Sequence, residues 1–598
     1  MTSEDGSLSV LSSSLPRDSD AVRFMQSATS PSDAAAVPSV AFAVPVAVPG
    51  RAAEDRGEGK EEEEANVLDD RTVSVVHIES VIAEPQGGST PPQYEFVMSI
   101  VERDVDKMAP FSPMLTPGTP GANARLIDAQ ATLMTEELMH DSFLLDLPEK
   151  SIESRLVKVR QELGADFEIK ECDKAQAIED LLENEFSSTK QEASAFYLMD
   201  LGTVVRKYEQ WVHLLPNVKP FYAVKANPLP AMVRTCKAVG TGFDCASQNE
   251  LEQVLELGVD PENIIFANPC KMKAHILYAK KHNVRKMTFD NEAELQKIHE
   301  NYPEAELILR LLPPDASSAV CNFGSKFGAD KKMTKRLLKQ ARKLGANVCG
   351  VSFHVGSGCW DPNAYTLAME LAYSVCMQAE NEYGFKMKIV DIGGGYPAAD
   401  NLTDSISFPT IAEVLNKSIQ KLFPPESGIQ IIGEPGRYLC GEAVVLAVSV
   451  IAKRTRVPAE STVYSENPDD ADDDSDENDD KEKQDDDEEE EQILYYLSDG
   501  VYGSFNNVMF DHQNPVPHVT GAAAVAAAAS ALSSGAKKST LFGPTCDSID
   551  VICRDVTLPE LEVGSWLYFL NMGAYTIAAA SSFNGFTPPN CKYIITPG

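Results

Sequence analysis

The sequence lacks the features of a zinc protein, a disulfide-rich secreted protein and a membrane protein. Its twelve cysteines are scattered and none form a Cys-x-x-Cys pair, so we expect a reducing, intracellular setting with no disulfide framework and no metal site. The apolar stretch at residues 41–48 is too short, and too interrupted by proline, to span a bilayer. We therefore expect a cytoplasmic protein that does not enter a membrane.

Basic residues are also scarce. Lysine and arginine number 52 against 90 aspartates and glutamates, and the net charge of −38 argues against nucleic acid or an anionic membrane as a partner. Much of the excess is local, because acidic residues crowd the segment 458–492. A block of like charge stays solvated, so we predict a disordered insertion there, and a second one at 519–538, where Ala and Ser dominate.

Composition divides the rest of the chain. Residues 1–160 are rich in Ser, Pro, Ala and charge, which predicts a disordered tail. A leading segment over 165–200 is expected to pack on a C-terminal, mostly-β domain at 439–598, and a barrel is expected over 201–438. The clearest strand patterns of the β domain lie at 443–451, 493–497, 565–569 and 574–580.

Strand-like apolar runs alternate with helix-like stretches in the middle of the chain. Eight such runs lie at residues 220–224, 242–245, 263–266, 286–289, 307–312, 348–354, 388–392 and 429–433. The alternation predicts an α/β fold with a (β/α)8 TIM-like barrel. A doubly wound sheet stays open as the alternative, because the pattern alone does not settle the number of strands.

Lys225 follows the first of these runs and is the most informative residue. A lysine at the end of a buried strand is costly unless it is paired or used covalently. If burial holds it neutral, its amine is ready to form a Schiff base, which points to pyridoxal 5′-phosphate as the cofactor. Taken alone, a lysine that snorkels into water is the better explanation, and the motifs downstream overturn it.

Polar residues recur where the other predicted strands end. They are Asp244, Arg310, His354, Asp391, Glu434 and Arg437. The carboxyl ends of parallel barrel strands meet on one face, where barrel enzymes hold their active sites. Each residue alone could be a polar loop group, but six at strand ends favour a shared site.

The chemistry of a phosphorylated pyridine ring suggests roles for several of these groups. Gly393, Gly394 and Gly395, and Ser357 between two glycines, suit backbone contact with a phosphate, although a tight turn is the usual reason for such a triplet. Glu434 could pair with the pyridine nitrogen, Arg437 with the phosphate, and His354 could stack on the ring.

The C-terminal region adds two acidic motifs. Asp511, after Phe510, and Asp547 are candidates to bind a cationic amine, and Cys546 is a candidate proton donor. The alternatives are solvated loop carboxylates and an inert buried thiol, and spacing alone does not decide between them.

Taken together, eight motifs are highly specific. They are Phe221–Lys225, Gly242–Ser247, Ala267–Lys271, Gly350–Gly358, Asp391–Gly395, Glu434–Tyr438, Asp499–Asn506 and Asn571–Tyr575. With them, residues 165–598 closely resemble the eukaryotic ornithine decarboxylase family. The resemblance implies an alanine racemase-like barrel with a C-terminal β domain, and head-to-tail homodimers whose active sites lie at the subunit interface. It implies decarboxylation of L-ornithine to putrescine with pyridoxal phosphate.

The resemblance also implies residue roles. Lys225 would carry the cofactor, and Asp511 and Asp547 would hold the distal amine of ornithine, with Cys546 and Asp547 coming from the second subunit. Phe510 stands where the family usually has Tyr. The other implied contacts with the cofactor or its surroundings are Asp244, Glu250, Arg310, His354, Ser357, Gly393, Gly394, Gly395, Glu434, Arg437 and Tyr575. Lys326 and Asp550 match a pair that bridges subunits in the family.

Two other functions stay open. One is a decarboxylase of the same family that acts on lysine or another basic amino acid, since one methylene is worth only about 1–3 kcal/mol of discrimination. The other is a non-catalytic regulator resembling antizyme inhibitor. Antizyme itself is a possible partner, because a basic stretch aligns with the segment that the family uses to bind it. A solvated helix face explains that stretch equally well. Its residues are Lys271, Lys273, Lys280, Lys281, Arg285 and Lys286.

Overall fold

A computed structural model of the chain describes part of its 598 residues. The described ranges are 72–82, 94–104, 147–174, 176–178, 180, 194–314, 319–321, 326–359, 361–398, 407–456, 492–519 and 537–597. The chain divides into two units, residues 1–114 and 115–598. In the first unit, β1 (Thr72–Ile82) pairs antiparallel with β2 (Tyr94–Asp104). The predicted tail did not include this hairpin, whose sequence is rich in Val and Ile.

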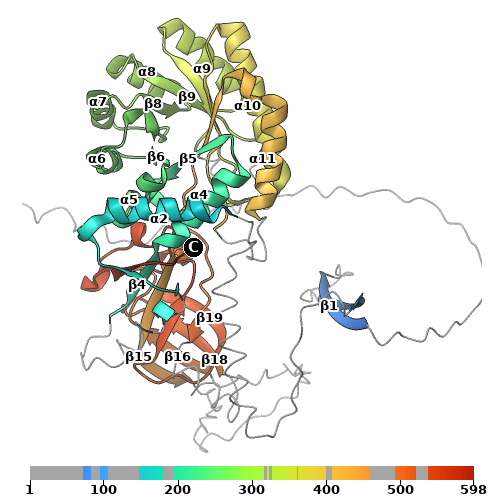
Figure 1. Cartoon of the computed structure of the whole chain (residues 1–598), viewed down its shortest axis with the longest axis vertical. Coiled ribbons are helices and arrows are strands. Elements are labelled where there is room, and N and C mark those ends of the chain that lie inside the picture. Colours follow the sequence, from blue (N-terminus) through green and yellow to red (C-terminus); the bar gives the residue numbers. More distant parts are fainter. Residues whose placement is uncertain are drawn as a thin grey trace, which may run out of the picture. The chain divides into compact units, whose positions relative to one another are not determined.

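Eight parallel strands of the second unit form a closed barrel, in the order β11-β13-β14-β5-β6-β7-β8-β9 (Figure 1). Their bounds are β5 Val218–Ala223, β6 Gly242–Cys245, β7 Ile264–Phe266, β8 Lys286–Phe289, β9 Glu306–Arg310, β11 Val348–Ser352, β13 Ile389–Asp391 and β14 Gln430–Gly433. The predicted barrel is confirmed and the doubly wound alternative is wrong, because β9 pairs with β11 and closes the ring.

Side chains from five strands fill the barrel as a small cluster separate from the main core. These are Phe221, Ile265, Ile308, Ile389 and Ile432, all almost fully buried. Neighbouring residues on the same strands point outward and join the main core, as expected for strands with period two. Both faces of each strand are therefore apolar, which is why the sequence shows continuous apolar runs rather than alternation.

Helices connect the barrel strands, and side chains cap several of them. They are α5 Pro230–Val239, α6 Gln248–Glu256, α7 Lys273–Lys281, α8 Glu292–Asn301, α9 Lys331–Leu344, α10 Pro362–Tyr383 and α11 Phe408–Leu422. Ser247 accepts a hydrogen bond from the first turn of α6, and Asn291 does the same for α8. Capping places each helix start at a fixed point after its strand, and so shapes the loops at the carboxyl ends.

Helical structure begins before the predicted tail boundary at residue 160. Residues Glu149–Leu163 form the helix α2. Its buried side chains are Ile152, Leu156, Val159 and Leu163, spaced four, three and four residues apart, which gives an apolar stripe on one face. The stripe was missed because charged residues dominate the segment. Residues 105–146 of the predicted tail lie outside the described residues, as do nearly all of the two predicted insertions.

The C-terminal domain is a mostly-strand sheet in the order β19-β18-β16-β15-β4-β21-β3, with β20 pairing with β15 and β17. Its strands are β3 Ile169–Glu171, β4 Phe196–Asp200, β15 Val444–Arg456, β16 Gln492–Leu497, β17 His518–Val519, β18 Lys537–Phe542, β19 Val551–Leu558, β20 Trp566–Phe569 and β21 Asn590–Ile595. Strands β3 and β4 come from the leading segment, ahead of the barrel in sequence. No helix among the described residues is long and apolar enough to cross a bilayer.

The predicted strand at 574–580 is wrong. Tyr575 has a φ of +56°, and Ile577–Ala579 form a 3-10 turn. The left-handed backbone at Tyr575 breaks an extended strand, and its N–H donates to Ala226 O at 2.9 Å, across to the barrel. The sequence pattern was apolar enough for a strand, but the contact with the barrel decided the conformation.

Close packing at Gly573 joins the β domain to the barrel. The side-chain amide of Asn227 donates to Gly573 O at 2.9 Å. A Cβ placed on Gly573 would lie 1.7 Å from Cys440 O, so any side chain would force the two segments apart.

We predict that Gly573→Ala lowers the free energy of unfolding by about 2–4 kcal/mol, because the added methyl must displace backbone. Urea titration of the purified variant measures this. Gly428→Ala is the matched control: Gly428 has a φ of +68° but nothing within 4 Å, so the backbone strain of about 1 kcal/mol is its only cost. Equal losses in the two variants would contradict the role of close packing.

Candidate active site

A cavity of about 500 Å³ lies at the carboxyl ends of the barrel strands. The predicted residues that line it are Lys225, Arg310, His354, Ser357, Gly395, Glu434, Arg437, Phe510, Asp511 and Tyr575. The last three come from the C-terminal domain, so barrel and β domain build the cavity together. The strand-end rule predicted the seven barrel residues of this lining, whereas Tyr575 was named only through the resemblance.

Lys225 donates a hydrogen bond from its Nζ to Oδ2 of Asp244, whose side chain is fully buried. Burial lowers the pKa of Lys225, but the charges of Asp244 and Glu434 outweigh it, and the pKa lies above its ordinary value. The expectation that burial holds this amine neutral is therefore wrong. Beside the cavity, Asp244 pairs with the ammonium form of Lys225.

Asp244 lies in a cluster of three carboxyl groups, together with buried Asp391 and half-buried Glu434. Burial raises the pKa of Glu434 well above its ordinary range, and the charges of Asp244 and Asp391 raise it further. Among the described residues, Glu434 Oε1, Asp244 Oδ1 and Asp391 Oδ2 lack a hydrogen-bond partner. A buried acceptor without a donor is costly, so Glu434 Oε1 fits a donor such as the N–H of a protonated pyridine.

The glycine triplet after β13 is required by its packing. Gly393 and Gly395 have φ values of +67° and +93°, and a Cβ on either would lie 2.2 Å from a carbonyl oxygen of the loop after β11. Side chains are excluded, which leaves the backbone of Gly395 facing the cavity next to Ser357. This arrangement fits a phosphate group held by main-chain N–H groups.

His354 presents a neutral ring to the same cavity. Its Nδ1 accepts a hydrogen bond from the N–H of Gly356 at 3.0 Å, which leaves the proton on Nε2. Burial and the neighbouring charges of Arg310 and Lys225 lower the pKa of His354 to about 3. An uncharged imidazole offers a flat surface suited to stacking on an aromatic ring.

Arg437 links the barrel to the C-terminal domain. Its Nη2 donates to Oδ2 of Asp511 at 2.5 Å, and its guanidinium lies 5.1 Å from the ring centroid of Tyr575. Tyr575 holds a left-handed backbone, which a bulky residue adopts only where the surroundings impose it. Burial raises the pKa of Asp511, and the charge of Arg437 opposes this shift.

Six predicted site residues do not line this cavity: Asp244, Glu250, Gly393 and Gly394 adjoin residues that do, whereas Cys546 and Asp547 lie apart from it. Cys546 is exposed, and its thiol donates to Asn584 Oδ1 at 3.5 Å. Asp547 accepts a hydrogen bond from the hydroxyl of Tyr502 at 2.6 Å. Neither lines the cavity that holds Lys225. Asp550, expected in a pair with Lys326, is buried and accepts hydrogen bonds from its own chain.

Sequence reasoning missed part of the cavity wall. Asn268 and Pro269 follow β7 and line the cavity, and Phe327 packs 5.2 Å from the Arg310 guanidinium. The strand-end rule that found the other residues also applies to Asn268, so that signal was available. Phe327 has no strand-end signal, because it lies in the loop before α9.

The basic stretch is not the continuous surface that was predicted. Lys271 and Lys286 are buried, and each forms an ion pair, with Glu294 and Glu262 respectively. Lys271 lies in the loop between β7 and α7, and Lys286 begins β8, so neither belongs to the exposed face of α7. Lys273, Lys280 and Lys281 of α7 are exposed.

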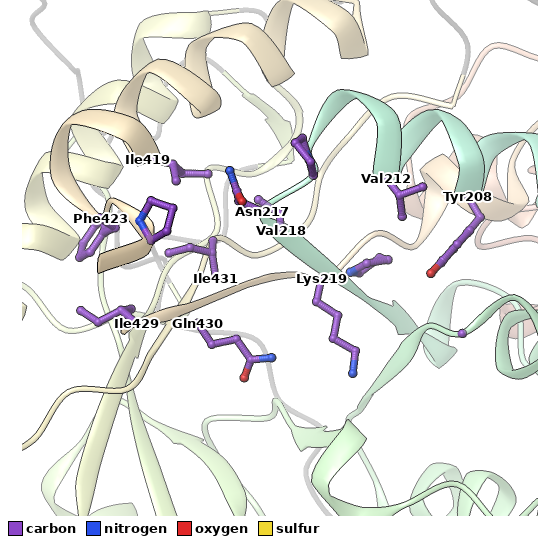
Figure 2. Close-up of a pocket in the computed structure, with 14 residues that line it drawn as sticks. Tyr208, Val212, Asn217, Val218, Lys219, Ile419, Phe423, Ile429, Gln430 and Ile431 are labelled. Carbon is purple, nitrogen blue, oxygen red and sulfur yellow. The ribbon is translucent and has the colours of Figure 1, made fainter. Parts of the chain in front are cut away.

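A second cavity, of about 390 Å³, lies at the opposite, amino end of the barrel (Figure 2). Its lining includes Val218, Ile419 and Phe423, and Lys219 donates to Asn263 Oδ1 at 2.6 Å. No carboxylate lines it, so it lacks the acid–amine pairing of the first cavity. No cluster of metal-ligating side chains occurs among the described residues.

We predict that His354 contributes to acid destabilisation of the cofactor-free protein. The pKa of His354 is lower in the folded state than in the unfolded state, so folding disfavours protonation of the ring. The contribution of neutral His354 to the free energy of unfolding is fully present above about pH 6.5 and falls as the pH drops toward 3. Between pH 6.5 and 5 the loss should be on the order of 1–2 kcal/mol. Urea titrations at both pH values should show a smaller loss for His354→Asn. An equal loss in variant and wild type would contradict the neutral histidine.

Comparison with known proteins places this geometry in a family. The family profile described as "Pyridoxal-dependent decarboxylase, pyridoxal binding domain" matches residues 201–441. Ornithine decarboxylase of Rattus norvegicus is 43% identical over 433 residues, which cover 72% of this chain and 87% of the rat protein. Antizyme inhibitor 2 of Xenopus laevis is 44% identical over 417 residues, covering 69% of this chain and 84% of that protein.

Solved structures agree with this assignment. The lysine/ornithine decarboxylase of Vibrio vulnificus, complexed with putrescine, superposes with a TM-score of 0.55 at 30% identity, covering 69% of this chain and 97% of that one. The glycine turn and the unpaired Glu434 oxygen fit pyridoxal phosphate, and Lys225 lines the same cavity. The chain belongs to the pyridoxal-dependent family of ornithine, arginine and lysine decarboxylases, and it is similar to the ornithine decarboxylases of that family.

Proposed function

We propose that this protein decarboxylates L-ornithine to putrescine and carbon dioxide. The observation that carries the proposal is that one cavity joins Lys225 and Glu434 of the barrel to Asp511 of the C-terminal domain. The first two suit the cofactor, and the third is a buried carboxylate that a substrate ammonium could pair with. The similar decarboxylase of Vibrio vulnificus was solved in complex with putrescine, which agrees with this substrate class.

Each residue of the cavity has a defined task in this proposal. Pyridoxal phosphate, when bound, supplies a ring that accepts the electron pair left at Cα as carbon dioxide departs. Lys225 would provide the amine that holds the cofactor, and Glu434 would accept a hydrogen bond from the N–H of the protonated pyridine ring. Arg437 and the Gly395 backbone face the phosphate, and neutral His354 covers the ring without adding charge.

Asp547 and Cys546 require a second copy of the chain in this proposal. Cys546 is exposed and Asp547 is half-buried, and both lie away from the Lys225 cavity. Large apolar side chains beside them are exposed. Ile549, two residues after Asp547, is 52% exposed, and Phe583, which stacks on the Asp547 partner Tyr502, is 40% exposed. Exposed apolar groups beside polar catalytic candidates are typical of an interface. We infer a homodimer in which each copy completes the site of the other.

Substrates one methylene longer are the nearest alternative. Asp511 and Asp547 favour a simple ammonium over a guanidinium, but lysine carries the same group, so an ornithine/lysine enzyme stays open. The resemblance to antizyme inhibitor 2 suggests a second alternative, a non-catalytic regulator. The convergence of Lys225, Glu434 and Arg437 in one cavity favours the enzyme.

Antizyme is a proposed partner of this protein, and the surface proposed to bind it is the exposed face of α7 rather than the whole basic stretch. Helix α7 exposes Lys273, Lys280 and Lys281, with Met272 and Leu277 at 69% and 45% exposure. An apolar and basic helix face suits an acidic, apolar partner surface. This partner, like the cytoplasmic location, stays a prediction.

We predict that wild-type protein loaded with pyridoxal phosphate forms putrescine from ornithine faster than it forms amines from lysine or arginine. Lys225→Ala should lose at least several kcal/mol of transition-state stabilisation, a drop of more than about a thousandfold. Chromatography of the amine products measures both.

The control is Lys219→Ala, which removes a lysine from the amino end of the same strand, β5, away from the cavity. Its turnover should stay within a few fold of wild type. A Lys225→Ala protein with near-normal turnover, or a wild type that forms no amine, would overturn the proposal.

We predict that mixing inactive subunits restores activity. Equal amounts of Lys225→Ala and Cys546→Ala chains, after exchange, should give about one quarter of wild-type activity, since half of the dimers are mixed and each holds one intact site. If Cys546 served its own chain, mixed dimers would hold no intact site. Native mass spectrometry of the mixture confirms that mixed dimers form, and their inactivity would count against the shared site.

A further inference from the structure

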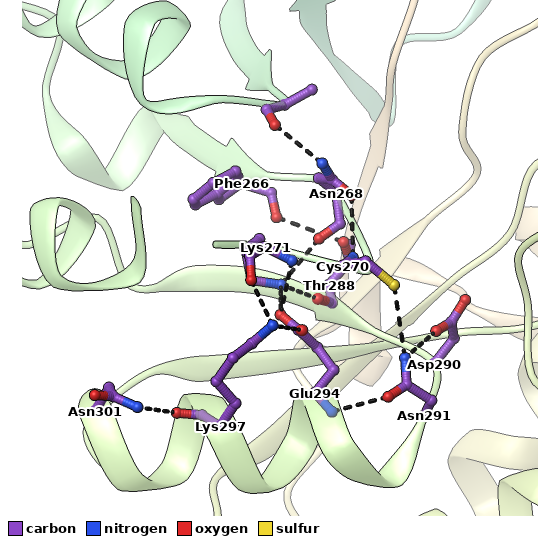
Figure 3. Close-up of polar contacts among 11 residues, drawn as sticks. Phe266, Asn268, Cys270, Lys271, Thr288, Asp290, Asn291, Glu294, Lys297 and Asn301 are labelled. Atoms are coloured by element: carbon purple, nitrogen blue, oxygen red, sulfur yellow. Dashed lines mark hydrogen bonds and ion pairs between the residues drawn. The ribbon is translucent and has the colours of Figure 1, made fainter. Parts of the chain in front are cut away.

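Lys271 is a fully buried lysine that the proposed chemistry does not use. It lies in the loop between β7 and α7, and its side chain is 0% exposed. Its Nζ contacts Glu294 Oε1 at 2.9 Å and donates to two backbone carbonyls, Asn268 O at 2.9 Å and Thr288 O at 2.6 Å (Figure 3). The ammonium therefore ties its own loop to β8 and to helix α8.

Glu294 and Lys297 hold the other side of this network. The side chain of Glu294 is 2% exposed, and its second oxygen pairs with Lys297 Nζ at 2.5 Å. Lys297 also donates to the carbonyl oxygen of Lys271, and the N–H of Lys271 donates to Glu294 Oε1 at 3.2 Å. Main chain and side chain of Lys271 are thus both fastened to α8, as Figure 3 shows.

The loop that Lys271 fastens is a wall of the cofactor cavity. Ala267, Asn268 and Pro269 line the cavity, and Lys271 itself does not. The amide of Asn268 donates to Ala246 O at 3.1 Å, and Ala246 also lines the cavity. A shift of this loop would therefore move two adjoining parts of the wall.

Further hydrogen bonds carry the network to another part of the wall. Asn291 contacts Cys270 Sγ at 3.7 Å and Asp290 Oδ1 at 3.0 Å. The other oxygen of Asp290 accepts a hydrogen bond from the N–H of Gly328 at 2.9 Å. Phe327, the neighbour of Gly328, lines the cavity. One polar layer thus stands behind the walls formed by the loops after β6 and β7 and by the loop before α9.

Stability alone does not account for a buried ion pair. Apolar residues of similar volume often give equal or greater stability than a buried ion pair, because desolvation of the charges offsets their attraction. The ammonium instead fixes geometry, because one Nζ donates hydrogen bonds to the carbonyl oxygens of both Asn268 and Thr288. An apolar side chain would leave both carbonyls without this donor and the loop less constrained.

We propose that Lys271 is a positioning residue that holds the Asn268–Pro269 wall in place and thereby sets the affinity of the protein for pyridoxal phosphate. The inference rests on the cofactor cavity and does not depend on which amino acid is decarboxylated. Lys271 acts through Asn268 and touches no cofactor atom.

The test is a cofactor titration of Lys271→Met. Apparent Kd values come from absorbance and protein fluorescence as pyridoxal phosphate is added to cofactor-free protein, and melting temperatures are recorded on the same samples. We expect binding weakened on the order of tenfold or more, as for a small displacement of a site wall. Turnover is not needed, so a protein that binds the cofactor but leaves ornithine intact would refute only the proposed function.

Lys286→Met is the matched control. Lys286 is another buried lysine in an ion pair, with Glu262 at 2.8 Å, but it lies at the amino end of β8, away from the cavity. It should lower the melting temperature by a similar amount and leave the Kd within about twofold. The proposal is overturned if Lys271→Met binds with wild-type affinity, or if both variants weaken binding equally.

Glu294→Gln replaces Lys271→Met if the latter does not fold. It keeps the shape of the side chain and removes the charge that anchors Lys271 and Lys297. The expected result is again weaker cofactor binding, by several fold. Unchanged affinity in a folded Glu294→Gln protein would then overturn the proposal.

Discussion

The site depends on one charge balance: the ammonium of Lys225 pairs with Asp244, which lies in a cluster of carboxyl groups with Asp391 and half-buried Glu434. Glu434 and Asp391 lie close enough to be affected by the same field. Buried like charges repel strongly, so protons and the lysine must share the task of neutralising them. A cofactor with a cationic ring nitrogen would suit this cluster, because it would bring a positive charge to these carboxyl groups.

The barrel provides the rigid frame that makes this balance possible. Carboxyl groups can be kept buried only where backbone and side chains are closely packed, as at Gly393 and Gly395. The C-terminal domain then closes the cavity through two contacts, Arg437 with Asp511 and Tyr575 with the backbone of Ala226. Because Asp511 and Tyr575 come from this second domain, the cavity exists only when barrel and β domain are joined.

Three lysines show how the same residue type serves different roles in one barrel. Lys225 lies beside a cavity and pairs with Asp244, whereas Lys271 has no access to the cavity and binds carbonyls and Glu294. Lys286 pairs with Glu262 at the other end of the strands. Position in the barrel separates these roles. Lys225 lies at the carboxyl ends of the strands, where the cavity is, Lys271 lies behind the cavity wall, and Lys286 lies at the amino ends, where residues contribute to stability.

The sequence by itself determined the barrel, its strands and most residues of the cavity, because continuous apolar runs and the polar residues that end them are local signals. It also determined the family through motifs such as Gly393–Gly395 and Glu434–Tyr438. Only the tertiary structure decided that Tyr575 breaks a strand, that Lys225 is charged beside Asp244, and that Lys271 is buried. It also decided that Cys546 lies away from Lys225 in its own chain. Each of these depends on groups distant in sequence, whose fields and contacts no local pattern contains.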